Sequence, residues 1–417
     1  MNAADIRPIE PSAQTQSLLD LFLIFVGADV VATTFQVGAS LAGSFSIRVA
    51  IVLIAAGSVV GATLVAALAP IGPRLRVPSV IATRPALGFG GAGVVAGVLY
   101  VTNFAWIALN NVIAASVCAK TFGFGSETAW SIAIGLAATA VVWGGPHAVA
   151  LADRVAVPLM LGVGVLLTVA SLHAPRAVAP LPQTALPWWR GFDVVVGYQV
   201  SWILMFADYS RYTRSARGSG VMVFLALAGT SLWLMALGTV AATAAGNSDP
   251  GAMMAAVGLG ASGALLLTLA TVTTNFVNIY MSSLAWKSLV PSGRDSAVVW
   301  SIGLVGTALG AVPGVWLAQY TNFMIVLGAI LLPIGGILIA HYYICANTAD
   351  SGLLDALYDP LGRYRGFTIA GMASWAAGAA AFFAAGSIGG TLPSLLVSIA
   401  CYVILRRWSS DLKSVDS

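Results

Sequence analysis

The chain has 417 residues, of which 59% are hydrophobic and only 8% are charged, and its mean hydropathy is +0.92. A water-soluble domain carries roughly 25% charged residues, most of them on its surface. The composition therefore excludes a secreted enzyme, a nucleic-acid-binding protein and a disordered chain. The three cysteines lie in apolar runs without metal-ligand spacing, so they predict neither a disulfide framework nor a metal site. The sequence is that of a polytopic membrane protein.

Twelve segments are apolar and long enough to cross a bilayer, which takes about 20 residues in a helix. In chain order they are predicted at 17–41, 48–71, 88–118, 129–145, 152–172, 192–208, 219–245, 258–284, 297–318, 322–345, 367–387 and 390–406. Together they form a single transporter domain over residues 17–406, between tails of residues 1–16 and 407–417. The first tail lacks the basic-then-apolar order of a cleavable signal peptide, so we expect the first span to be retained.

The positions of the basic residues predict the orientation of the chain. With the N-terminus inside, 15 of the 19 Lys and Arg residues fall on inner segments. Only Arg48, Lys120, Arg176 and Arg190 remain outside. We therefore expect a multi-pass protein of the plasma (inner) membrane with both termini in the cytoplasm.

Polar side chains in the middle of a span are candidates for function, because a polar group that faces hydrocarbon is costly. In the first span, Asp29 lies near mid-membrane and precedes Thr33, Thr34 and Gln36. One interpretation of Asp29 is a neutral, hydrogen-bonded acid that caps a kink. The other is a proton or cation partner beside an unwound segment.

The third and sixth spans each combine an aromatic ring with an amide. Trp106 and Asn110 are spaced i and i+4, so an indole that can stack on a flat ring shares a helix face with an amide that can bind the ring's edge. Alternatively, this pair holds two helices together. Gln199 and Trp202 are i,i+3 neighbours in the sixth span, and we interpret Asp208 at its end as structural.

The eighth span has the oxygen ligands that a hard cation requires. Ala270, Thr273 and Thr274 share one face, Asn278 lies one turn beyond Thr274, and Asn275 lies on a neighbouring stripe. Two hydroxyls beside a small residue suit sodium when a broken helix supplies carbonyl oxygens. The alternative is that the threonines bond back to carbonyls four residues earlier.

Enzyme signatures are absent from the sequence, which has no HExxH, GxSxG or Walker motif. We therefore predict a protein that is not an enzyme and that needs no cofactor apart from a coupling ion.

Four segments resemble the nucleobase–cation symporter family, whose members are permeases for purines, cytosine, allantoin, hydantoin and hydroxymethylpyrimidine. They are VGADVVATTFQVGASL in the first span, PSVIATRPALGFGG leading into the third, GYQVSWILMFADYSRYTR in the sixth and TTNFVNIY in the eighth. The last two are the most specific, and the match extends from Phe25 to Tyr280.

The resemblance implies an all-α, LeuT-type fold of twelve transmembrane helices. Two inverted five-helix repeats (about 17–172 and 192–345) would be followed by two peripheral helices (about 367–406). The first and sixth spans would be broken at mid-membrane, and the substrate would lie between them and the third and eighth spans.

The same resemblance implies roles for particular residues. Trp106 would stack on the substrate ring, and further contacts would come from Asn110, Gln199, Trp202, Asn275 and Asn278. Sodium would bind to the hydroxyls of Thr273 and Thr274, the carbonyl of Ala270 and main-chain oxygens between Val26 and Asp29. Because Asp29 departs from the family pattern, protons could replace or assist sodium.

The implied activity is import of a small planar heterocycle, cytosine or a purine, by alternating access coupled to a sodium or proton gradient. Hydroxymethylpyrimidine, a thiamine precursor, is the alternative cargo, because SWILMFADYSRY resembles that branch whereas TTNFVNIY resembles cytosine permeases. A passive channel or a membrane-embedded enzyme is an alternative from another class. The expected partners are the substrate and the lipid bilayer, without nucleic acid, and the sequence leaves the stoichiometry and the oligomeric state open.

Overall fold

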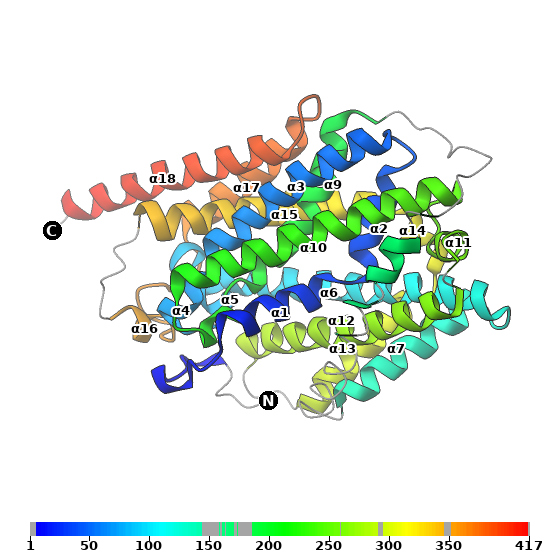
Figure 1. The fold of residues 1–417 in the computed structure, drawn as a ribbon. Coiled ribbons are helices and arrows are strands. Elements are labelled where there is room, and N and C mark those ends of the chain that lie inside the picture. Colours follow the sequence, from blue (N-terminus) through cyan, green and yellow to red (C-terminus); the bar gives the residue numbers. More distant parts are fainter. Residues whose placement is uncertain are drawn as a thin grey trace.

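The computed structural model describes residues 6–143, 158, 161–162, 164–170, 173, 186–258, 260–290, 295–345 and 352–415. This described part contains helices and no strands, and its long helices run side by side in one bundle (Figure 1). Five of its helices are singly long and apolar enough to cross a membrane, and a bent pair makes a sixth crossing. The predicted all-α fold is confirmed. The span predicted at 152–172 lies largely outside the described residues.

The first predicted span consists of two helices, α1 (Leu18–Asp29) and α2 (Ala32–Leu41), which are bent by 52° relative to each other. A capping box at Ser17 and Asp20 starts α1 by satisfying free backbone N–H groups. The helix stops at Val30 and Val31, so the regular series of backbone hydrogen bonds is interrupted there. The predicted interruption beside Asp29 is confirmed.

The sixth span is also interrupted. Helix α9 (Trp188–Val200) is followed by two 3₁₀ turns, Ser201–Met205 and Ser210–Tyr212. A stretch of 3₁₀ winding inside a span often marks a hinge, because its hydrogen bonds are poorer than those of an α-helix. Both interruptions therefore occur near the middle of their spans.

The other spans are longer helices joined by short ones. The long helices are α3 (Ile47–Leu68), α6 (Arg84–Phe122), α7 (Glu127–Trp143), α10 (Ala216–Ala245), α12 (Gly260–Leu289), α13 (Asp295–Leu309), α15 (Tyr320–Ala340), α17 (Ile369–Ala384) and α18 (Thr391–Val415). The short ones are α4 (Ile71–Leu75), α5 (Ser79–Ala82), α11 (Pro250–Ala256), α14 (Pro313–Ala318) and α16 (Leu353–Ala356).

Two helix ends differ most from the prediction. The ninth span was expected to reach residue 318, but α13 ends at Leu309 and Pro313 starts the separate helix α14, as expected of a residue that cannot continue a helix. The last helix was expected to end at residue 406, but α18 continues to Val415, because its final turns contain neither Gly nor Pro.

Glycines allow one half of the first broken span to touch a helix of the second half. A Cβ on Gly38 of α2 would lie 1.7 Å from the Met235 carbonyl oxygen, and one on Gly238 of α10 would lie 1.9 Å from the Phe35 carbonyl oxygen. Such close backbone contact is possible only without side chains. The two glycines therefore hold α2 directly against α10.

Helices α17 and α18 pack against each other and against α15 at one edge of the bundle (Figure 1). Asp193 of α9 fixes this edge, since its carboxylate accepts hydrogen bonds from the Gly390 N–H (2.7 Å), the Thr391 N–H (3.1 Å) and the Thr391 hydroxyl (2.6 Å). These contacts satisfy backbone groups at the start of α18. The peripheral pair is thus attached through the sixth span.

Candidate functional site

A buried cavity lies where the two interruptions face each other. The centres of water-sized molecules can occupy about 40 Å³ of it, more than the roughly 10–15 Å³ that one water molecule needs. Its walls come from the break between α1 and α2, from α9 and the following 3₁₀ turn, and from α6, α12 and α15. The third and eighth spans thus meet the first and sixth at this cavity.

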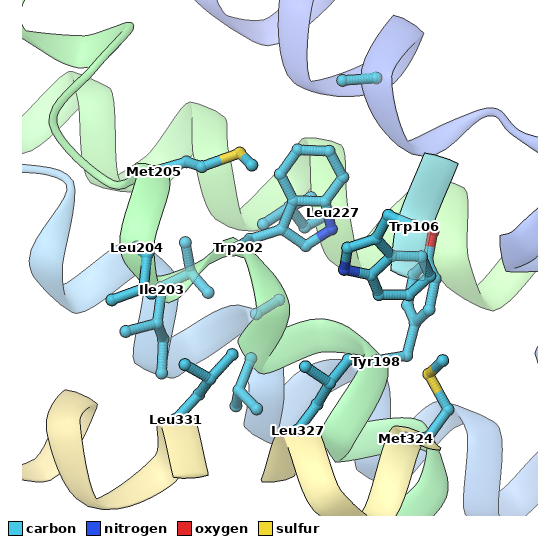
Figure 2. Close-up of a cluster of buried hydrophobic side chains, with 14 of the residues drawn as sticks. Trp106, Tyr198, Trp202, Ile203, Leu204, Met205, Leu227, Met324, Leu327 and Leu331 are labelled. Atoms are coloured by element: carbon cyan, nitrogen blue, oxygen red, sulfur yellow. The ribbon is translucent and has the colours of Figure 1, made fainter. Parts of the chain in front are cut away.

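Two tryptophans form aromatic walls of this cavity. Trp106 of α6 is held by Tyr198 and by Phe323, with ring centroids 5.7 Å and 5.3 Å away and interplanar angles of 88° and 71°. Trp202, in the 3₁₀ turn after α9, packs against Phe25 at 6.0 Å. Figure 2 shows the two indoles at the centre of the cluster, with Tyr198 beside Trp106. The chamber therefore presents fixed aromatic surfaces from two different spans.

Four residues that line the cavity each have one buried polar atom with no hydrogen-bond partner within the described part of the chain. These atoms are Asn103 Nδ2, Asn110 Oδ1, Asn278 Nδ2 and Trp202 Nε1. Buried polar atoms are nearly always paired in native proteins, so such a concentration points to a hydrogen-bonding ligand or water. The indole N–H can only donate, whereas an amide can present either its N–H or its oxygen.

A chain of asparagines fixes the orientation of Asn110. Its Nδ2 donates to Asn275 Oδ1 at 3.2 Å, and Asn275 Nδ2 donates to Asn111 Oδ1 at 2.9 Å. The Thr271 hydroxyl donates to the Asn110 carbonyl at 3.2 Å. Asn275 is fully buried between α6 and α12 and does not line the cavity. It therefore positions Asn110 from behind.

Gln199 also lies away from the cavity wall. Its Nε2 donates to the Leu227 carbonyl of α10 at 3.3 Å, and its side chain packs where a Cβ on Gly61 of α3 would lie. Its neighbours Tyr198 and Trp202 line the cavity instead. Trp106, Asn110, Trp202 and Asn278 are thus brought together, while Gln199 and Asn275 stand behind the wall.

The sequence reasoning missed four polar members of the wall, which are Thr102, Asn103, Tyr198 and Ser201. Asn103 lies three residues before Trp106, so it shares the helix face on which Trp106 and Asn110 were found. That spacing could have identified Asn103 from the sequence. Tyr198 was recognised only as part of a motif, and nothing in the local sequence showed that its ring would point into the cavity.

The oxygen atoms expected to bind sodium do not all face one point. Thr274 lines the cavity, and the Thr273 hydroxyl donates to the Leu269 carbonyl at 3.1 Å, the back-bond that was the alternative. The Val26 carbonyl accepts the Val30 N–H at 2.9 Å. Position 270 lies within α12, and its side chain is outside the described residues.

The Asp29 carbonyl accepts hydrogen bonds from the Val31 N–H (2.9 Å) and the Thr34 hydroxyl (2.5 Å). Both of its lone pairs are therefore occupied. Its side chain is completely buried and points to α10, where Oδ2 is hydrogen-bonded to the hydroxyls of Thr230 (2.5 Å) and Ser231 (2.7 Å). Asp29 thus joins the break of the first span to the seventh.

Asp208 has structural contacts, as interpreted from the sequence. Its Oδ1 accepts the Ser79 N–H at 3.3 Å, and the Ser79 hydroxyl accepts the Ala207 N–H at 2.8 Å. The contacts attach the end of the sixth span to helix α5, which leads into the third span.

Two discontinuous helices around a cavity at mid-bundle are the arrangement found in many secondary transporters. Over residues 8–403 the chain matches the family described as permease for cytosine/purines, uracil, thiamine, allantoin. It belongs to this family, as the sequence motifs predicted, and its family and fold are those of transporters and not of enzymes.

The chain is similar to characterised relatives along most of its length. It is 25% identical to the cytosine permease of Escherichia coli (strain K12) over 340 residues, which are 80% of this chain and 79% of the relative. The cytosine permease of Escherichia coli O157:H7 matches to the same extent.

Solved structures show the same fold. The inward-facing conformation of Mhp1 superposes with a TM-score of 0.84 at 18% identity, covering 97% of this chain and 93% of that chain. A closed conformation of Mhp1, a nucleobase-cation-symport-1 family transporter with bromovinylhydantoin bound, gives 0.82 at 18% identity, with 99% and 96% covered. A Na⁺-coupled sialic acid symporter gives 0.64 at 11% identity, with 98% and 92% covered. The LeuT-type architecture expected from the motifs is confirmed, and the chain is a multi-pass membrane protein.

Proposed function

We propose that this protein imports a nucleobase, cytosine or a purine, in symport with sodium or protons. The observation that carries the proposal is the cavity at the two helix interruptions, which is lined by two tryptophans and three asparagines. Four of these five residues have a buried polar atom without a hydrogen-bond partner in the described residues. In secondary transporters with broken helices, substrate binds at this position.

The chemistry of the cavity wall matches a flat heterocycle. Trp106 and Trp202 offer aromatic surfaces on which a ring can stack, and stacking contributes about 1–3 kcal/mol per base in other proteins. The Trp202 N–H requires an acceptor on the ligand, and Asn103, Asn110 and Asn278 can bind acceptors or donors. The edge of a nucleobase carries both kinds of group in one plane.

Hydroxymethylpyrimidine is the second candidate, favoured by one feature of the wall. Leu327 and Leu331 of α15 add an apolar side to the cavity (Figure 2). Alkyl substituents on a pyrimidine ring would be accommodated there without loss of hydrogen bonds. The relatives named as cytosine permeases favour the unsubstituted base.

We further propose that residues 17–406 act as one transporter domain in the plasma (inner) membrane, with both termini in the cytoplasm. The split of basic residues between the two sides supports this orientation.

The direct test is uptake by proteoliposomes that contain the purified full chain. Labelled cytosine, adenine and hydroxymethylpyrimidine would be offered separately, with an inward sodium gradient, an inward proton gradient, or neither. We expect one of these compounds to accumulate above its external concentration under one gradient and to return unmodified. Trp106→Ala should abolish uptake, whereas Trp408→Ala, at an exposed position of α18, should not. Equilibration without accumulation would indicate a channel, and no uptake of any compound would refute the proposal.

A further inference from the structure

Asn110 differs from the other amides of the cavity wall because a neighbour fixes its orientation. Its Nδ2 donates to Asn275 Oδ1 at 3.2 Å, and Asn275 does not line the cavity. The polar atom that Asn110 retains for a ligand is therefore Oδ1, which is buried and has no partner within the described residues. The Nδ2 atoms of Asn103 and Asn278 have no such partner there, so these two amides can turn to offer either atom.

We propose that Asn110 selects substrates that carry an amino group on the ring and discriminates against those with a carbonyl group in its place. The favoured class includes cytosine and adenine, and the disfavoured class includes uracil and hypoxanthine. This inference rests on the proposed function and narrows its substrate class, because an oxygen that can only accept a hydrogen bond requires a donor on the ligand.

The orientation of Asn110 depends on two further asparagines. Asn275 Nδ2 donates to Asn111 Oδ1 at 2.9 Å, so the three amides form one directed chain between α6 and α12. All three side chains are buried. If Asn110 turned alone, its oxygen would meet the oxygen of Asn275, and neither atom has a proton to share. Asn110 can therefore reverse only if all three amides reverse together.

The far end of the asparagine chain favours the observed direction. Asn111 Nδ2 and Thr307 Oγ1 are neighbours, since they lie 2.5 Å and 2.3 Å from the position of a Cβ on Gly135. The Thr307 hydroxyl donates to the Gly303 carbonyl at 2.7 Å, so a lone pair of its oxygen is left for other groups. An N–H of Asn111 matches that lone pair better than the amide oxygen would. With Asn111 in this orientation, the other end of the chain presents an oxygen.

The rest of the wall makes this oxygen decisive for recognition. No charged side chain is among the described residues that line the cavity, so hydrogen bonds are the polar contacts offered to a ligand. Asn278 lines the cavity one helical turn from the Asn110–Asn275 contact. Its Nδ2 can donate to the ring nitrogen beside the amino group, which has a free lone pair in cytosine and adenine. In uracil and hypoxanthine an oxygen replaces the amino group and would face Asn110 Oδ1 without a proton between them.

Two matched pairs of compounds test this selection on the purified wild-type chain. Cytosine and uracil form one pair, adenine and hypoxanthine form the other, and the members of each pair have the same ring and nearly the same size. The affinity of each compound would be measured by calorimetry. In each pair that binds, we expect the amino compound to bind roughly 10- to 100-fold more tightly, since its analogue leaves a buried oxygen unpaired. Equal affinities within a pair, or a preference for uracil or hypoxanthine, would overturn the proposal.

Variants of Asn275 connect the selection to the orientation of Asn110. Asn275→Ala removes the fixed partner, so Asn110 can turn and the two members of a pair should bind with similar affinity. Asn275→Asp keeps an oxygen that accepts from Asn110 Nδ2, so the preference should remain. Trp106→Ala is the matched control, because it weakens stacking of both members alike and leaves the ratio of their affinities unchanged. A general loss of stability does not alter this ratio, and a wild-type ratio in Asn275→Ala would contradict the assigned role of Asn110.

Uptake separates this proposal from the proposed function. If proteoliposomes with the wild-type chain accumulate a nucleobase, and uracil or hypoxanthine competes as well as cytosine or adenine, the proposed function stands and the selection by Asn110 fails. If no heterocycle is bound or accumulated, the proposed function fails and the selection fails with it. Should Asn275→Ala not fold, the wild-type pairs still decide whether an amino group is required.

Discussion

Trp106 and Tyr198 meet edge to face, with ring centroids 5.7 Å apart and an interplanar angle of 88°. Because the Tyr198 hydroxyl is in turn bonded to Thr34 of α2, this ring pair connects the third span to both interrupted spans. Phe323 of α15 supports the indole from a second direction. The stacking surface of Trp106 is thus positioned by three other spans, and movement of either interruption would move it.

Replacement of Trp106 tests whether this surface binds the substrate. We expect Trp106→Ala to weaken binding by about 1–3 kcal/mol, the usual contribution of base–aromatic stacking, and Trp106→Phe to retain part of the affinity because a smaller ring remains. Equilibrium binding of labelled cytosine to the purified protein measures both. Trp408→Ala, at an exposed tryptophan, controls for a general effect on folding. Equal affinity in Trp106→Ala and wild type would exclude stacking on this residue.

Trp202→Phe separates a ligand contact from a structural one. The indole Nε1 of Trp202 has no hydrogen bond of good geometry in the described residues, although it faces the Asp29 carboxyl, so its removal should cost the empty protein little. We expect the thermal midpoint of the empty protein to stay within a few degrees of wild type. Binding should weaken by about 0.5–1.5 kcal/mol, the net contribution of a neutral hydrogen bond. Thermal unfolding with and without ligand measures both quantities. A lower midpoint with unchanged ligand stabilisation would contradict this assignment.

Asn275→Ala tests the role of the asparagine chain. The change removes the partners of Asn110 Nδ2 and Asn111 Oδ1 and leaves both buried without hydrogen bonds. Each such group costs about 1–3 kcal/mol, so the protein should be less stable, and substrate should bind more weakly because Asn110 is free to turn. Asn322→Ala, at an exposed position of α15, is the control. If Asn275→Ala keeps wild-type stability, the chain does not support the site.

The pattern of the sequence was sufficient for the spans and for part of the site. Apolar runs located the helices, and the resemblance to the symporter family predicted both interruptions. The i,i+4 spacing of Trp106 and Asn110 placed them correctly on one face, since α6 is regular at this point. Gln199 and Trp202 were expected on one face for the same reason. Only Trp202 lines the cavity, whereas the Gln199 side chain lies against α3 and α10.

Other residues of the site could not be identified from the sequence around them. Leu327 and Leu331 are two leucines in a helix that is apolar throughout, so only packing selects them for the cavity wall. The partners of Asp29 on α10, Thr230 and Ser231, lie about 200 residues further along the chain. The sequence showed that a buried Asp29 needed a hydrogen-bond partner, but it could not show which hydroxyls would donate to it.

The contact between α2 and α10 gives a prediction about stability that has an internal control. A methyl group on Gly238 would lie 1.9 Å from the Phe35 carbonyl oxygen and 3.1 Å from the Ala39 nitrogen, and both are backbone atoms. Neither atom can move without separating the two helices. We therefore expect Gly238→Ala to destabilise the protein by at least about 1–3 kcal/mol, as overpacking does. It should also impair transport, because α2 is one half of an interrupted span.

Gly229→Ala is the matched change in the same helix. Nothing lies within 4 Å of a Cβ at Gly229, so alanine should stabilise α10 by up to about 1 kcal/mol through its higher helix propensity. Thermal unfolding of the two variants in the same detergent compares them directly. A midpoint for Gly238→Ala at or above that of Gly229→Ala would mean that α2 and α10 are not in backbone contact. The position of α2 beside the break of the first span would then need another explanation, because α10 contacts both halves of that span in this structure.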